Sequence, residues 1–303
     1  MRIIVFGAGA LGSLFGALLS RQNEVYLVGR KEHVEVINYR GLEVEGKSDG
    51  TFEVSAGERL KDAPFYPNWI ILTVKAYQTE EAADEILNTF PNVPVVSFQN
   101  GIKNEEILRE MGINAVGGVT SHGVTYLGPG RIRHAGTGRT VIGELDGRIS
   151  MRVRALAYVL SEAGIITEVS DNIKGEIWLK GSVNAVINPI TAILGVENGY
   201  LLEIESLRKL GDEVAEECEE IARARSIDLP GRPIEEWKTV AEMTKHNLSS
   251  ALQDIKNGKR TEIREINGAF LKIAEKNGIN AKYNRVLTEM VIAKEKLNEL
   301  KID

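Results

Sequence analysis

The chain opens with an apolar segment that runs directly into a glycine-rich turn. Residues Arg2–Phe6 are apolar without a break after Arg2, which is typical of a strand buried on both faces of a parallel sheet. The next six residues follow the pattern Gly-x-Gly-x-x-Gly, with glycines at Gly7, Gly9 and Gly12. In such a turn the glycines permit a tight bend, close approach to a pyrophosphate, and tight packing of helix on strand. The segment therefore predicts the start of a dinucleotide-binding unit.

Alternating strand and helix patterns continue this unit to about residue 170. Strands are expected at 24–28, 69–74, 93–98 and 115–119, and helices at 10–21, 31–40, 79–87 and 104–111. Short apolar segments indicate a hairpin at 42–44 and 52–54, and antiparallel strands that complete the sheet edge at 124–126, 131–133 and 140–142. A helix at 150–163 and a strand at 165–169 follow. The pattern predicts an α/β fold with an N-terminal Rossmann-type doubly wound sheet.

No strand pattern is found after Ser170. Helical stretches alternate there with breaks expected at Pro189, Gly195, Gly199, 230–233, Gly258 and Gly278. We therefore expect two domains: residues 1–170 as the dinucleotide-binding domain and residues 171–303 as an all-helical domain.

The composition argues against several other classes of protein. The chain has 37 Lys and Arg against 43 Asp and Glu, a net charge of −6, and no basic tract, so neither nucleic acid nor an anionic membrane is expected as a partner. Cys218 is the only cysteine, and the histidines lack paired ligand spacing, so no metal is expected. No apolar run was found to approach the roughly eighteen residues of a membrane helix. We expect a soluble cytoplasmic protein.

A polar stripe is predicted on an otherwise apolar helix. Lys180, Asn184 and Asn188 are four residues apart, so they lie on one helix face. A core helix would carry Leu or Val there, because a buried ammonium or amide without partners costs several kcal/mol. The stripe therefore indicates an active site. Gly181 beside it lowers helix propensity by about 1 kcal/mol relative to Ala, for a reason the sequence does not show.

Side chains after three predicted strands are expected near the cofactor, because ligands in this fold bind beyond the carboxyl ends of the strands. Arg30 stands where an NAD-selective site would place an acid, so it favours the 2′-phosphate of NADPH; stacking on adenine is the alternative. Lys75, Gln99 and Asn100 follow two further strands and are expected to border the nicotinamide. For Lys75, a solvated side chain remains open.

These motifs together resemble the 2-dehydropantoate 2-reductase, or ketopantoate reductase, family over essentially the whole chain. The glycine turn alone would also fit 3-hydroxyisobutyrate and 6-phosphogluconate dehydrogenases. The order and spacing of the remaining motifs make the resemblance specific. They are Lys75-Ala76-Tyr77-Gln78, Gln99-Asn100-Gly101, Lys180 through Ala192, Asn198-Gly199, Asn247 through Asp254 and Thr261-Glu262-Ile263.

The resemblance implies reduction of the ketone of 2-dehydropantoate to (R)-pantoate in pantothenate and coenzyme A biosynthesis. Lys180 would be the acid that protonates the carbonyl oxygen, and Glu262 the catalytic glutamate that orients it; a surface ion pair is the alternative. The substrate would contact Asn100, Asn184, Asn188, Asn198, Asn247 and Ser250. The cofactor would contact Gly7, Ala8, Gly9, Ala10, Leu11, Gly12, Arg30, Lys75, Gln99, Asn100 and Glu262. The spacing of Asn247, Ser250 and Asp254 predicts a shared helix face, whereas Asn198 suits a cap equally well.

NADPH is the expected cofactor, with NADH left open. The resemblance also implies that the helical domain, residues 171–303, binds the substrate and forms a homodimer. Coenzyme A shares adenine, a pyrophosphate and a ribose phosphate with NADPH, so we expect it to compete for the cofactor site. Two alternatives stay open: a related dehydrogenase of another 2-oxo or 3-hydroxy acid, and a nonenzymatic NADP(H)-binding redox sensor that would not need Lys180 or Glu262.

Overall fold

The computed structural model describes residues 1–300, which divide into two compact units. Unit 1 comprises residues 1–99 and 104–173. Unit 2 comprises residues 100–103 and the chain from residue 174 onward, so the loop 100–103 belongs to the unit that follows much later in the sequence. The last three residues of the predicted helical domain lie outside the described part of the chain.

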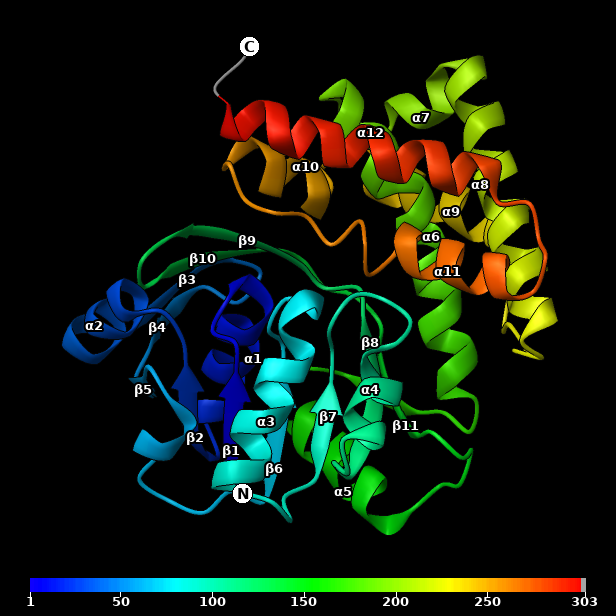
Figure 1. Ribbon diagram of the computed structural model, residues 1–303. Coiled ribbons are helices and arrows are strands. Elements are labelled where there is room, and N and C mark those ends of the chain that lie inside the picture. Colours follow the sequence, from blue (N-terminus) through cyan, green and yellow to red (C-terminus); the bar gives the residue numbers. More distant parts are fainter. Residues whose placement is uncertain (301–303) are drawn as a thin grey trace. The chain divides into compact units, whose positions relative to one another are not determined.

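An eight-stranded sheet forms the centre of unit 1 (Figure 1). Its strand order is β12-β11-β8-β7-β6-β1-β2-β5. The six strands from β5 to β8 are parallel, whereas β11 pairs antiparallel with β8 and carries β12 beside it. The switch point of the sheet therefore lies between β1 and β6, where the strand order reverses. The strands are β1 (Arg2–Phe6), β2 (Glu24–Val28), β5 (Ser55–Gly57), β6 (Trp69–Leu72), β7 (Val95–Ser97), β8 (Ala115–Thr120), β11 (Thr140–Glu144) and β12 (Thr167–Val169).

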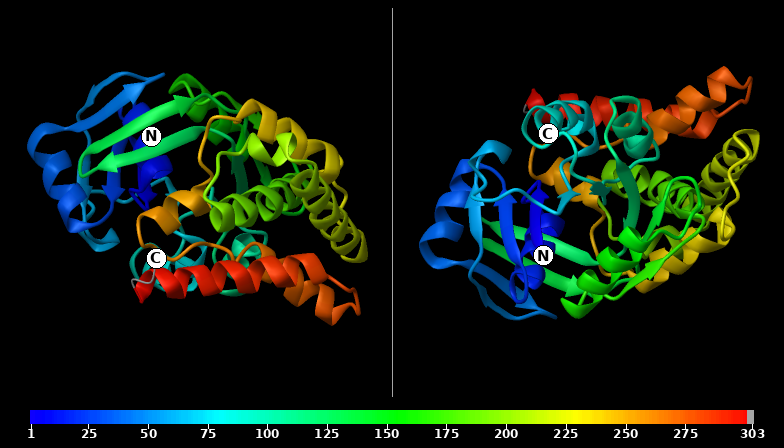
Figure 2. Two further views of the ribbon diagram at one scale, coloured as in Figure 1. Left: turned by 90° about the horizontal axis from the view of Figure 1, so that it is seen from above. Right: turned by 90° about the horizontal axis from the view of Figure 1, so that it is seen from below.

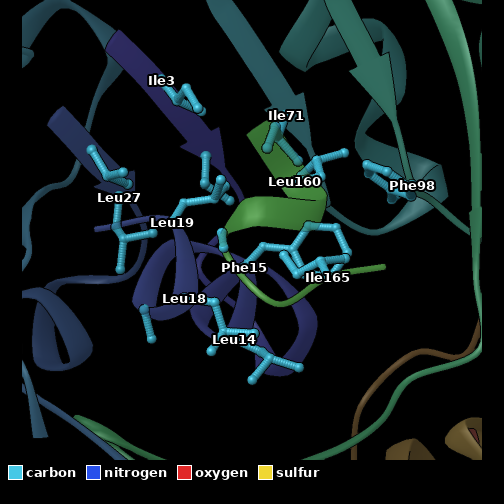
Figure 3. Close-up of a cluster of buried hydrophobic side chains, with 14 of the residues drawn as sticks. Ile3, Leu14, Phe15, Leu18, Leu19, Leu27, Ile71, Phe98, Leu160 and Ile165 are labelled. Atoms are coloured by element: carbon cyan, nitrogen blue, oxygen red, sulfur yellow. The ribbon is translucent and has the colours of Figure 1, made fainter. Parts of the chain in front are cut away.

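Helices cover both faces of this sheet. On one face Phe15 of α1 meets Phe98 edge to face, with ring centroids 5.0 Å apart, and Leu160 of α5 belongs to the same core (Figure 3). On the other face Ile86 of α3 and Leu108 of α4 pack in a second buried cluster. The predicted doubly wound α/β fold is thus confirmed. The helices are α1 (Ala10–Ser20), α2 (Lys31–Arg40), α3 (Thr79–Thr89), α4 (Asn104–Glu110) and α5 (Met151–Glu162), with short 3-10 turns at η1 (Leu60–Asp62) and η2 (Ala76–Gln78).

A separate four-stranded sheet corrects one sequence prediction. Of the antiparallel segments expected to complete the main sheet, only β11 does so; β9 (Gly123–Gly128) and β10 (Arg131–Gly136) pair with β3 (Leu42–Gly46) and β4 (Gly50–Phe52) instead. The two hairpins join because β10 runs parallel to β3, with Ile132 opposite Val44. The buried side chains of Leu42, Val44 and Ile132 belong to the same core as α1. Figure 2 shows this small sheet from two sides.

All regular secondary structure in residues 174–300 is helical, as predicted. Trp237 of α9 is fully buried, and its indole nitrogen donates to Asp212 of α8 at 3.1 Å. Helices α11 and α12 both pack against α8. The helices are α6 (Ile173–Leu194), α7 (Tyr200–Glu203), α8 (Glu205–Ala224), α9 (Pro233–Met243), α10 (Ser250–Lys256), α11 (Asn267–Lys276) and α12 (Lys282–Glu299).

Helix α6 departs from two expectations. The break predicted at Pro189 is wrong, since α6 continues through the proline and ends before Gly195, whose φ is +72°. The proline is tolerated because Asn267 Nδ2 donates to the Ala185 carbonyl, which Pro189 leaves without a donor in the helix. Contrary to the sequence estimate, α6 is long and apolar enough to cross a membrane, yet 78% of its most apolar stretch is buried inside the protein. That burial is typical of a core helix.

Candidate functional site

The glycine turn after β1 is too tightly packed for any other residue at two of its positions. Gly7 has φ +113°, and a Cβ there would lie 2.5 Å from the backbone nitrogen of Val74. A Cβ on Gly12 would lie 2.2 Å from the Gly7 carbonyl oxygen and 2.5 Å from Thr73 Oγ1. Side chains at these positions would therefore push β1, α1 and the end of β6 apart.

Gly9 has different surroundings. Outside its chain neighbours, a Cβ on Gly9 would approach no described atom more closely than the Gly7 carbonyl oxygen at 4.0 Å. The turn is thus open at its second glycine, where α1 presents the N–H groups of its first turn. A phosphate group can approach the backbone here, because no side chain covers it.

Thr73 is part of the turn that sequence reasoning missed. Its Oγ1 donates to the Gly7 carbonyl at 2.8 Å, and its backbone N–H donates to the Phe6 carbonyl at 2.8 Å. Thr73 follows β6, so these bonds join the ends of β1 and β6 at the switch point of the sheet. The only signal in the sequence was its place in the predicted strand 69–74.

Arg30 and Lys75 lie at element ends that follow β2 and β6. Arg30 is the exposed residue that precedes α2, and Lys75 is the half-buried residue that precedes η2. Burial raises the pKa of the Tyr126 hydroxyl, and the nearby positive charge of Arg30 opposes that rise. The charge of the exposed residue Arg30 therefore acts on β9 of the small sheet.

Gln99 is buried among protein partners. Its Nε2 donates to the Val74 carbonyl at 3.1 Å and to Thr79 Oγ1 at 2.9 Å, and its Oε1 accepts from Ser97 at 3.3 Å. Both amide hydrogens are thus used within unit 1. The side chain braces the segments that follow β6 and β7.

A pocket in unit 2 gathers residues from three separate segments. Its empty volume of about 250 Å³ includes the open solvent at its mouth. Asn188 comes from α6, Ser250 and Asp254 from α10, and Glu262 from the segment before α11. Sequence reasoning missed the remaining wall residues Ala251, Ile263, Ile266 and Asn267. Lys180 and Asn184 are half-buried on α6, about two turns and one turn before Asn188 respectively, and are not among the wall residues.

Glu262 is held on several sides. Its carboxylate accepts a hydrogen bond from Asn100 Nδ2 at 2.9 Å, across 162 residues of sequence. Beside it, Thr261 donates through its backbone N–H at 2.8 Å and its hydroxyl at 2.6 Å to the buried Glu295 of α12. Arg264 donates to the other oxygen of Glu295 at 2.6 Å. The backbone around Glu262 is therefore anchored to α12 on both sides.

The glycine at position 181 is explained by the close packing of the loop 100–103 against α6. A Cβ on Gly181 would lie 2.4 Å from Cγ2 of Ile102, in the loop that carries Asn100. The missing side chain lets this loop lie against α6. The loss of helix propensity is thus linked to the position of Asn100, the partner of Glu262.

The predicted helix face of Asn247, Ser250 and Asp254 needs correction. Helix α10 begins only at Ser250, because the Ser249 hydroxyl caps it by accepting from Leu252 N at 3.1 Å. Asn247 precedes the helix, and its carbonyl accepts from the backbone N–H of Asn198 at 3.1 Å. The structure thus brings Asn198 and Asn247 together through the backbone, and places Ser250 and Asp254 on the pocket wall.

Comparisons with known proteins cover both units. Residues 3–147 match the family described as Ketopantoate reductase PanE/ApbA, and residues 172–295 match Ketopantoate reductase PanE/ApbA C terminal. The chain is 39% identical over 298 residues to the 2-dehydropantoate 2-reductase of Pyrococcus horikoshii, with 98% of each chain covered.

Two solved structures are similar over nearly their full length. The PanE/ApbA family ketopantoate reductase from Ralstonia eutropha JMP134 is 31% identical, with a TM-score of 0.91 and coverage of 99% of this chain and 100% of that one. A D-mandelate dehydrogenase, solved with NADH and anilino(oxo)acetate, is 30% identical, with a TM-score of 0.89 and the same coverage. The chain is therefore similar both to a protein named ketopantoate reductase and to one named D-mandelate dehydrogenase.

Proposed function

We propose, since the chain belongs to the ketopantoate reductase PanE/ApbA family, that it reduces 2-dehydropantoate to (R)-pantoate with a nicotinamide cofactor. The observation that carries this proposal is the pocket of unit 2, where Glu262, Asn188 and Ser250 meet although the sequence separates them. The reaction would belong to the biosynthesis of pantothenate and coenzyme A, in the cytoplasm.

Residues 1–170 are proposed to bind the cofactor. The glycine turn fits a dinucleotide. The backbone at Gly9 is accessible to a phosphate, whereas the lack of side chains at Gly7 and Gly12 allows β1, α1 and the end of β6 to pack closely. Ala8, Ala10 and Leu11 complete the turn, and Lys75 is assigned to the same ligand. When bound, the cofactor supplies the hydride. Gln99 would act by bracing the loops, since protein groups take both of its amide hydrogens.

The helical unit is proposed to bind the substrate and supply the proton. Lys180 would donate a proton to the carbonyl oxygen and stabilise the negative charge that develops there. Glu262, positioned by Asn100, would orient that ammonium group. Ser250 would bind the carboxylate, and Asn184, Asn188, Asn198 and Asn247 would contact the other polar groups. The same unit is proposed to form a homodimer.

Arg30 supports NADPH as the preferred cofactor. This exposed residue follows the end of β2, where an acidic residue would repel a 2′-phosphate. Coenzyme A carries a related set of groups and is proposed to inhibit by occupying the same turn. Inhibition that stays constant as NADPH is varied would contradict a shared site.

The similarity to D-mandelate dehydrogenase favours one alternative, a reductase of another 2-oxo acid. The pocket wall argues for a polar substrate, because Asn188, Ser250 and Asp254 would face a phenyl ring poorly. An assay of NADPH oxidation with 2-dehydropantoate and with phenylglyoxylate separates the two. Faster turnover of phenylglyoxylate would contradict the proposed function, and no turnover of any 2-oxo acid would favour the redox sensor.

A further inference from the structure

Pro189 leaves a backbone carbonyl open on the helix that lines the pocket. A proline has no N–H, so the carbonyl of Ala185, four residues earlier, has no donor within α6. Asn267, at the start of α11, supplies the donor: its Nδ2 lies 2.8 Å from the Ala185 oxygen. The amide of Asn267 thus replaces the hydrogen bond that the proline removes.

A second hydrogen bond fixes the orientation of this amide. The Glu217 carboxylate of α8 accepts from Asn284 Nδ2 at 2.9 Å, so Asn284 presents its Oδ1 in the other direction. That oxygen accepts from Asn267 Nδ2 at 3.0 Å. Both hydrogens of Asn267 Nδ2 are therefore donated, and a flipped amide would place Oδ1 against two acceptors.

The remaining atom of this amide is a buried acceptor on a residue of the pocket wall. Asn267 is fully buried, and its Oδ1 has no hydrogen-bond partner within residues 1–300. Asn267 also belongs to the pocket wall, together with Asn188, Ser250 and Glu262. A buried acceptor without a partner is unfavourable, so a ligand that brings a donor to it gains affinity over one that does not.

We propose that Asn267 is a specificity-determining residue whose Oδ1 accepts a hydrogen bond from a hydroxyl group of the substrate. The inference rests on the proposed function. Near neutral pH the carboxylate and the ketone of 2-dehydropantoate are acceptors only, so its terminal hydroxyl is the one group that can donate. The site therefore selects 2-oxo acids that carry a hydroxyl group over those with a purely hydrocarbon chain.

The test compares two substrates that differ only in this hydroxyl group. For the wild-type protein, kcat/KM is measured with 2-dehydropantoate and with 3,3-dimethyl-2-oxobutanoate, which keeps the carbon skeleton. Sites that hydrogen-bond a substrate hydroxyl reject the analogue without it strongly, and we expect a preference of at least about 100-fold. Comparable kcat/KM for both acids would overturn the inference alone, whereas turnover of neither would overturn the proposed function with it.

Variants then assign the preference to Asn267. Asn267→Leu keeps the approximate shape and removes the acceptor, so we expect the preference to fall at least about tenfold. Asn284→Ala is the control, because Asn284 belongs to the same buried network but not to the pocket wall. It should lower both activities alike and keep their ratio. An unchanged ratio in Asn267→Leu would show that Asn267 is only structural.

A measurement on the wild-type protein covers the case in which Asn267→Leu does not fold. A crystal structure with (R)-pantoate should place the terminal hydroxyl oxygen within hydrogen-bond distance of Asn267 Oδ1, at about 3.2 Å or less. A water molecule on Oδ1, with the hydroxyl group bound elsewhere, would overturn the assignment.

Discussion

The two units build their candidate sites from different parts of the chain. In unit 1 the glycine turn is mostly backbone, and Gly7 and Gly12 matter because they have no side chain. In unit 2 the pocket is made of side chains, and Glu262 depends on Asn100 from a distant part of the sequence. A backbone site follows from a short motif, whereas a side-chain site requires the whole unit to be folded. Substitutions should therefore act differently in the two units.

The largest effect is expected at Lys180. Lys180→Ala should lower kcat by a factor of about 10² to 10⁴, because it removes the proposed acid. A fluorescence titration should show nearly unchanged NADPH affinity, since the glycine turn belongs to unit 1. Glu262→Ala should behave similarly, and the double variant should lose less than the product of the two effects. Near-normal turnover of Lys180→Ala would rule out its role as the acid.

Gly12→Ala should have the next largest effect, on both cofactor binding and stability. The new Cβ would overlap the Gly7 carbonyl, so we expect the KM for NADPH to rise about 10- to 100-fold and the melting temperature to fall. Gly9→Ala is the matched control, because its Cβ would meet open space. It should weaken cofactor binding while the melting temperature stays constant. Equal loss of stability in both would contradict this distinction between the two glycines.

Acid should destabilise unit 1 through His33. Burial lowers the pKa of His33 to about 4, and Gly130 N–H donates to its Nδ1 at 2.8 Å, so the folded protein holds it neutral. The unfolded chain, with a pKa near 6.5, binds the proton more readily, so stability is present above pH 6.5 and is lost as the pH falls toward 4. Between pH 7 and pH 5 the loss is about 2 kcal/mol.

Urea unfolding at these two pH values measures the loss, and His33→Gln should reduce it. Part of the pH dependence should remain in this variant, because burial also lowers the pKa of His122 to about 4. A pH dependence identical to that of the wild type would show that His33 does not titrate on unfolding.

The smallest effect is expected at Arg30. Arg30→Ala should raise the KM for NADPH about tenfold and leave the KM for NADH unchanged, because only NADPH has a 2′-phosphate. Steady-state kinetics with both cofactors measures this. An equal rise in the KM for both cofactors would indicate that Arg30 stacks on adenine. A wild-type preference for NADH would show that Arg30 does not select the cofactor.

The sequence predicted most of unit 1 because its strands are apolar runs and its turn is local. It did not predict the small sheet, because the pairing of β10 with β3 depends on which hairpins meet in space. The helix through Pro189 was also missed, because the donor for the Ala185 carbonyl comes from Asn267. Thr73 and Asn267 carry no local motif, since their roles arise from contacts with distant segments. The polar stripe on the predicted helix pointed to Lys180, whereas family resemblance supplied Glu262 and the expected roles of both residues.

The loop 100–103 has a consequence for recombining these units. The polypeptide enters unit 2 at residue 100, returns to unit 1 at residue 104, and enters unit 2 again at residue 174. A fragment of the helical unit that begins at residue 174 would lack Ile102, which fills the space beside Gly181. It would also lack Asn100, which binds Glu262. A chimera that exchanges helical units between relatives should therefore carry this four-residue insertion with the transplanted part.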